Sequence, residues 1–143
     1  MSPEQKNLVK STWAMVMPIA DTAAGLFYDR LFASDASTRA MFTSTNMAEQ
    51  RKKLMQALAF VINGLDETER LVPTIQSLGR NHVRYGVSAK HYDSVGSALL
   101  WTLEQGLKDA WTPKVKEAWV AAYTLVAGVM KDAANAGQIK ASA

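Results

Sequence analysis

Apolar residues recur every three to four positions along most of this chain, and this helical spacing constrains its fold more than any other feature. The apolar stripes fall in five segments, at residues 19–33, 47–64, 71–84, 88–103 and 113–136. No segment alternates polar and apolar residues for long enough to predict a convincing strand. With a further helix ahead of residue 18, the pattern predicts an all-α protein of about six main helices joined by short turns.

Prolines and capping residues predict where these helices begin. Ser2 followed by Gln5 has the spacing of a capping box. Thr112 precedes a proline and predicts the start of the last helix, and Pro73 is expected in the first turn of its own helix. Pro18 is expected to separate the first helix from the second.

Size and composition indicate one ordinary globular domain. The chain has 143 residues, of which 48% are hydrophobic and 20% are charged, so a disordered chain is excluded. We expect a single domain over residues 1–143, with a loose tail from about residue 137. The absence of cysteine excludes disulfides, thiolate metal sites and cofactor attachment through thioethers.

Charge and hydropathy give little sign of a nucleic acid or membrane partner. The formal net charge is +3, and the densest basic run is the single stretch at residues 51–53. A nucleic-acid-binding domain shows a more concentrated basic stripe. No apolar stretch reaches the roughly 18 residues of a membrane span. The first residues lack an apolar signal core, so we expect a cytoplasmic protein.

His82 is the most informative polar residue because it continues an apolar stripe. The stripe runs through Leu71, Ile75 and Leu78 before it reaches the imidazole. The spacing alone favours a core histidine bonded to a backbone carbonyl over a metal ligand. A structural zinc site needs about four ligands, whereas an iron porphyrin can be held by a single histidine. His91, in a polar first turn, is expected at the surface.

Two further polar residues lie on apolar faces of other helices. Tyr28, beside Phe27 and Phe32, has the pattern of a core tyrosine whose hydroxyl reaches a partner at the boundary. Gln50 begins the stripe of residues 47–64, where an amide exposed to water is the simpler interpretation. Taken alone, neither residue indicates a binding site.

The order and spacing of these residues nevertheless resemble a known family, the bacterial single-domain haemoglobins and the globin domain of flavohaemoglobins. The resemblance extends from about Glu4 to Met130. The motifs that carry it are Leu26-Phe27-Tyr28, Leu31-Phe32, Met41-Phe42, Gln50-Arg51-Lys52-Lys53-Leu54, Leu78-Gly79-Arg80-Asn81-His82, Tyr85-Gly86-Val87, His91-Tyr92-Asp93-Ser94-Val95-Gly96, Ala118-Trp119 and Ala122-Tyr123.

This resemblance implies a globin fold around a non-covalent haem b, with His82 as the proximal ligand of the iron. Lys53 would reach a haem propionate, although a solvated lysine is an equally good interpretation. Phe42 would stack on the porphyrin. The residues that the resemblance assigns to haem contacts are Phe42, Lys53, Leu54, Leu78, Val87, Tyr92 and Val95.

On the distal side, the resemblance assigns Tyr28 and Gln50 as a polar pair and Leu54 as the residue that limits the space for the ligand. A hydrogen bond to a charged partner contributes roughly 1.5–3 kcal/mol, which corresponds to about 10- to 100-fold in affinity. We therefore expect tight binding of dioxygen, with a smaller effect on carbon monoxide. Because Gln50 takes the place of a distal histidine, we expect five-coordinate ferrous iron.

The sequence departs from the flavohaemoglobin pattern at two points. Ala134 occupies the position where those proteins carry a glutamate, and Asp132 is expected to point elsewhere. A carboxylate there would make the proximal imidazole more electron-donating, so peroxidase-like chemistry is in doubt. The length leaves no room for flavin and nicotinamide domains, so we expect any electron donor to be a separate reductase.

Four functions remain open at this point. The first is reversible binding of dioxygen as a carrier or store. The second is nitric oxide dioxygenation with an external electron donor, which needs the same pocket. A gas sensor acting through a partner and a haem-free helical interaction module are the other two.

Overall fold

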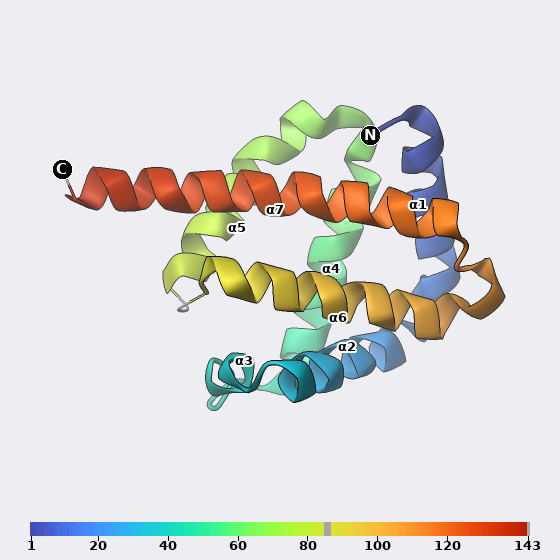
Figure 1. The fold of residues 1–143 in the computed structure, drawn as a ribbon, viewed down its shortest axis with the longest axis horizontal. Coiled ribbons are helices and arrows are strands. Elements are labelled where there is room, and N and C mark those ends of the chain that lie inside the picture. Colours follow the sequence, from blue (N-terminus) through green and yellow to red (C-terminus); the bar gives the residue numbers. More distant parts are fainter. Residues whose placement is uncertain (85–86, 143) are drawn as a thin grey trace.

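The computed structural model describes the backbone of residues 1–84 and 87–142, and the side chains of residues 1–82 and 87–134. The Tyr85-Gly86 part of one motif therefore lies outside the described residues. Within them the chain is helical and contains no strand (Figure 1), which confirms the all-α prediction. Six helices have at least 14 residues, and α3 is a short seventh. The helices are α1 (Pro3–Val16), α2 (Ala20–Ser34), α3 (Ala36–Ala40), α4 (Met47–Asn63), α5 (Thr68–Arg84), α6 (Ala89–Leu107) and α7 (Pro113–Ser142).

The predicted capping residues act where they were expected. The Ser2 hydroxyl accepts a hydrogen bond from the backbone N–H of Gln5 at 3.1 Å, and the Gln5 side chain accepts from the Ser2 N–H at 3.0 Å. The Thr112 hydroxyl accepts from the Val115 N–H at 3.2 Å at the start of α7. Pro18 lies in a 3₁₀ turn between α1 and α2, which confirms the predicted break.

Two helix boundaries differ from the prediction. Pro73 lies inside α5, which begins at Thr68, so its expected place in the first turn was wrong. Pro73 removes only the bond to the Glu69 carbonyl, and both residues are exposed, so that carbonyl can bond to water. The last helix, expected to end near residue 136, runs to Ser142. Ala133, Ala134 and Ala136 directly precede these extra turns, and alanine favours helix continuation.

Helices α1, α2, α6 and α7 enclose the main apolar core, which we call the dense core. Trp13 of α1 and Trp119 of α7 pack with ring centroids 6.4 Å apart. The Trp119 indole N–H donates to the buried Thr12 hydroxyl at 2.9 Å. The buried members of the dense core are Val9, Trp13, Val16, Ala23, Phe27, Tyr28, Leu31, Ile62, Leu65, Ala98, Leu99, Leu103, Leu107, Val115, Ala118, Trp119 and Ala122.

A second apolar group, the α5–α7 cluster, consists of Leu71, Ile75, Tyr92, Ala127 and Met130. Helix α5 packs closely on α7, and a Cβ added at Gly79 would collide with the Met130 backbone. Only glycine therefore allows this approach of the two helices.

Helix α4 packs mainly on α2 and α1, and α5 mainly on α7, so α4 and α5 are not closely packed against each other. They meet at the corner where Gly64 contacts the Leu71 side chain, and they leave that corner in different directions (Figure 1). Apolar residues of both helices, such as Leu54 on α4 and Leu78 on α5, stay half-buried. Among the described residues, no helix is both long enough and apolar enough to cross a membrane.

Candidate functional site

Tyr28 and Gln50 come together although 22 residues separate them. The Gln50 amide donates to the Tyr28 hydroxyl oxygen at 3.1 Å, from α4 to α2. Tyr28 is 5% exposed. Burial raises the pKa of Tyr28, and the smaller opposing effect of the Gln50 bond does not reverse this. The phenol is therefore protonated at neutral pH, and its O–H can donate to a third group.

Aromatic rings surround the Tyr28 side chain on several sides. Its ring centroid lies 5.0 Å from that of Phe27, 5.8 Å from Phe32 and 5.6 Å from Phe42. Phe32 and Phe42 also line a cavity of about 680 Å³, together with Arg39, Met47 and neighbouring residues. The Tyr28 hydroxyl is thus a polar group in an apolar, aromatic setting.

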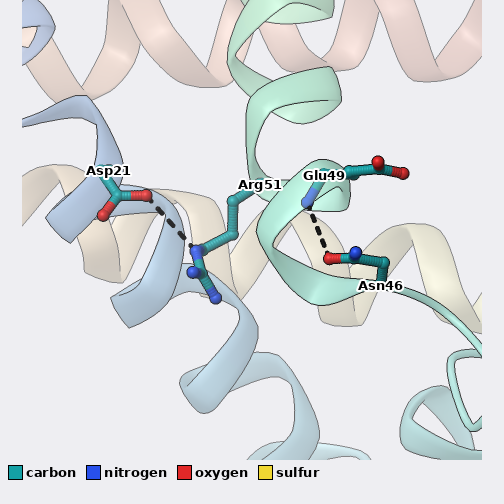
Figure 2. Close-up of polar contacts among 4 residues, drawn as sticks. All are labelled: Asp21, Asn46, Glu49 and Arg51. Carbon is teal, nitrogen blue, oxygen red and sulfur yellow. Dashed lines mark hydrogen bonds and ion pairs between the residues drawn. The ribbon is translucent and has the colours of Figure 1, made fainter.

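Figure 2 shows two contacts at the start of α4, the helix that carries Gln50. The Asn46 side chain caps the helix by accepting from the Glu49 N–H at 3.2 Å. The Arg51 side chain reaches Asp21 of α2, with 3.4 Å between Nε and Oδ1. An exposed ion pair contributes little to stability. The Asn46 cap defines where α4 begins, and the Arg51–Asp21 contact lies beside the place where Gln50 approaches Tyr28.

His82 lies half-buried near the end of α5. Its Nδ1 lies 2.6 Å from the Leu78 carbonyl oxygen. A carbonyl can only accept, so Nδ1 carries a proton and the neutral ring has its lone pair on Nε2. This is the backbone carbonyl bond expected for a core histidine. It is also the bond that fixes the tautomer and orientation of a metal-ligating histidine.

The apolar residues that the sequence assigned to a cofactor are divided between the two apolar groups. Phe42, Leu54 and Val95 pack at the margin of the dense core, and Leu78 and Val87 at the margin of the α5–α7 cluster. All five are half-buried.

The two groups share Val61 of α4 and Tyr123 of α7 at their margins. Lys53, on α4, is exposed. Half-buried apolar side chains from α4, α5 and α6, with a cation on α4, suit a flat apolar group with an anionic edge. The donor set, one imidazole with its tautomer fixed, suits a cofactor that needs one axial ligand.

Behind this apolar wall, α6 is fastened to α7. The Tyr123 hydroxyl donates to the Tyr92 carbonyl oxygen. Burial raises the pKa of Tyr123 strongly. Lys131 places its ammonium 5.4 Å from the centre of the Tyr92 ring. Ala134 supplies no carboxylate, and Asp132 is exposed. The charged group over the Tyr92 ring is thus the Lys131 ammonium.

Two residues gain roles that sequence reasoning missed. His91, expected simply at the surface, accepts from the Ser88 N–H at 2.8 Å and contacts Ser37 at 3.0 Å. The signal was the Ser88-x-x-His91 spacing, which is that of a capping box with histidine in the place of glutamate or glutamine. Gly79 sets the approach of α5 to α7, which no local pattern indicates.

Comparison with known proteins adds the family. A model of the globin family matches residues 25–130. The flavohemoprotein of Bacillus subtilis is 31% identical over 132 residues, which cover 88% of this chain and 33% of that protein. The flavohemoprotein of Xylella fastidiosa is 32% identical over 133 residues, which cover 92% of this chain and 33% of that protein. The chain thus spans about a third of the length of these relatives. The chain belongs to the globin family, and this membership implies a haem that binds a diatomic gas.

Proposed function

We propose that this chain is a haem-b globin that binds dioxygen reversibly and with high affinity. The observation that carries the proposal is the hydrogen bond between the buried Tyr28 and the half-buried Gln50, whose O···N distance is 3.1 Å. If Gln50 were only an exposed amide and Tyr28 only a core tyrosine, we would expect no hydrogen bond between them. Together they form a polar pair beside several aromatic rings. His82 lies on a different helix, α5, which packs on α7.

His82 would hold the haem through Nε2, with the Leu78 carbonyl fixing the ring. When bound, the haem supplies the iron to which a gas coordinates. Phe42 would stack on the porphyrin, Leu54 would limit the space on the distal side, and Val87, Tyr92 and Val95 would line the other side. Lys53 would neutralise a propionate at the exposed edge.

Tyr28 would donate its hydroxyl proton to a polar diatomic ligand. The Gln50 amide already donates to the phenol oxygen, which polarises the O–H and strengthens it as a donor. Because burial raises the pKa of Tyr28, this donor is kept through neutral pH. Dioxygen accepts such a bond more strongly than carbon monoxide does, so the pair favours dioxygen.

The test compares gas release from haem-loaded wild-type protein and Tyr28→Phe. The variant keeps the ring and loses the donor, so dioxygen dissociation should become about 10- to 100-fold faster. Stopped-flow mixing measures this rate, and carbon monoxide dissociation in the same samples is the internal control. An unchanged ratio of the two rates would exclude Tyr28 as the distal donor.

The proposal also predicts the colour of the protein. Wild-type protein mixed with haem should give a Soret band that shifts when carbon monoxide is added. His82→Ala should fold but should not give the stable five-coordinate ferrous spectrum that we expect of the haem-loaded wild type. A wild-type chain that ignores haem would leave the helical interaction module as the better function.

A second candidate is nitric oxide dioxygenation, in which nitric oxide, dioxygen and one electron give nitrate. The likeness to flavohemoproteins favours it, because the name of those relatives refers to both a flavin and a haem. This chain would take its electron from a separate flavoprotein reductase. Steady-state consumption of nitric oxide with and without such a reductase separates this enzyme from a carrier.

A further inference from the structure

His91 lies at the centre of a chain of hydrogen bonds that joins three parts of the fold. Its Nδ1 accepts from the Ser88 N–H at 2.8 Å, immediately before α6. Its Nε2 lies 3.0 Å from the Ser37 hydroxyl on α3. The Ser37 hydroxyl lies 2.5 Å from Asp35 Oδ1, and the other oxygen of Asp35 accepts from Ser94 at 2.8 Å.

These contacts fix the protonation state of the imidazole. A backbone N–H can only donate, so Nδ1 carries no proton and the ring is neutral. Its single proton is on Nε2, where it is donated to Ser37, and Ser37 passes its own proton to Asp35. Protonation at Nδ1 would place two donors opposite each other and break the bond from the Ser88 N–H, and the new proton would be left to the Ser88 hydroxyl oxygen, which lies 3.2 Å from Nδ1.

Ser88, which bonds to His91, directly follows Val87, which bonds to the His82 backbone. The Val87 N–H donates to the His82 carbonyl oxygen at 3.0 Å, and the next N–H, that of Ser88, donates to His91. Two consecutive amides thus tie the start of α6 to α5 on one side and to His91 on the other. Tyr92, which follows His91, is 7% exposed and packs with Leu71 and Ile75 of α5.

We propose that His91 is a positioning residue: its neutral imidazole holds the start of α6 against the His82 end of α5, and protonation of the imidazole releases that hold. The proximal side of the site therefore loosens in acid. The second half of this proposal rests on the proposed function, because it takes His82 as the residue that holds the haem.

Opposing charges make His91 a two-state element. Asp35 faces it from the start of α3, and Lys90 and Asp93 flank it on α6. The pKa of Asp35 lies below its ordinary value, mainly because Ser37 and Ser94 donate to it. An ionised Asp35 attracts a cationic imidazole, whereas the Ser88 N–H requires a neutral one. Both states therefore have a partner.

The first test follows the cap directly in the full-length chain. Nuclear magnetic resonance over a pH series should show the Ser88 amide and the His91 ring shifting together, with one common midpoint. His91→Gln places the usual capping-box residue at this position, so the Ser88 amide should keep its bonded shift at every pH. His91→Ala should give the unbonded shift throughout. A Ser88 amide that ignores the titration of His91 in the wild type would overturn the proposal.

The second test measures the consequence for the cofactor. Acidification should accelerate haem loss about fivefold more in the wild type than in His91→Gln, because one cap bond is lost in the wild type alone. His91→Ala should lose haem faster at both pH values. Identical pH profiles for the wild type and His91→Gln would refute the link to His82.

A control separates the two nitrogen contacts. Ser37→Ala removes the partner of Nε2 and leaves Nδ1 intact, so the midpoint should move while the Ser88 response persists. A chain that takes up no haem would end the proposed function and the link to haem with it. The Ser88 amide would still decide whether His91 controls the cap.

Discussion

Leu103 on α6 and Leu58 on α4 both lie on apolar stripes, yet the first is 2% exposed and the second is half-buried. The same contrast holds for the helices that carry them. Helix α6 contributes seven buried residues, whereas Ile62 is the one buried residue of α4. A stripe in the dense core is covered by other side chains, whereas the stripe on α4 packs at the margin of that core and stays half-buried. On the proposed function, this difference would separate apolar faces that serve folding from those that serve binding.

The sharpest way to break the dense core is Trp119→Ala. Loss of a buried tryptophan should lower the free energy of unfolding by about 3–5 kcal/mol. It also removes the donor to Thr12, whose hydroxyl keeps its bond to the Leu8 carbonyl. Urea unfolding followed by circular dichroism measures the change. A loss below 1 kcal/mol would show that this core is less tightly packed than described.

A matched pair of leucines tests the contrast itself. Leu103→Ala should destabilise the haem-free protein by about 2–5 kcal/mol, as deletions at closely packed sites do. Leu58→Ala should cost only about 1 kcal/mol, since its side chain is already partly in water. The same unfolding experiment, run on both variants, gives the comparison. Equal losses would contradict the division into a folding face and a binding face.

The approach of α5 to α7 is tested by Gly79→Ala. The added methyl group would overlap the Met130 backbone, so the helices must separate at a cost of about 1–3 kcal/mol. Gly128→Ala is the control, because a Cβ there meets nothing within 4 Å. The control should be neutral or slightly stabilising. A neutral Gly79→Ala would mean that α5 can move without loss.

The smallest expected effect concerns acid stability at the start of α3. Because the pKa of Asp35 is lower in the folded chain than in an unfolded one, its contribution is present above the unfolded value. That contribution is lost as the pH falls below about 4. Asp35→Asn should therefore reduce the fall in melting temperature between pH 7 and pH 3. A steeper fall in the variant would reverse the sign of this argument.

The helices were predictable because each is specified locally, by its stripe and its caps. Pro73 shows the limit of such rules. Its position fits the first turn of a helix that begins at Leu71, but α5 begins at Thr68. A local rule for proline does not fix how far a helix extends ahead of it.

The site was less accessible to sequence reasoning. Tyr28 and Gln50 each favour a simpler interpretation alone, and the contact between them depends on how α2 and α4 pack. The family resemblance assigned Tyr28 and Gln50 to one site, because the members of a family share their tertiary structure. His91 escaped notice for a different reason: histidine is an unusual third residue of a capping box, and Ser37 lies 54 positions away.

The Trp13–Trp119 contact has an optical consequence. Trp111 also packs at the margin of the dense core, and Trp101 lies on α6. Helices α4 and α5 carry no tryptophan. Intrinsic fluorescence therefore reports on one half of the molecule. A haem nearby would quench that emission by energy transfer, so unfolding of the dense core and loading of the cofactor could be followed in the same sample.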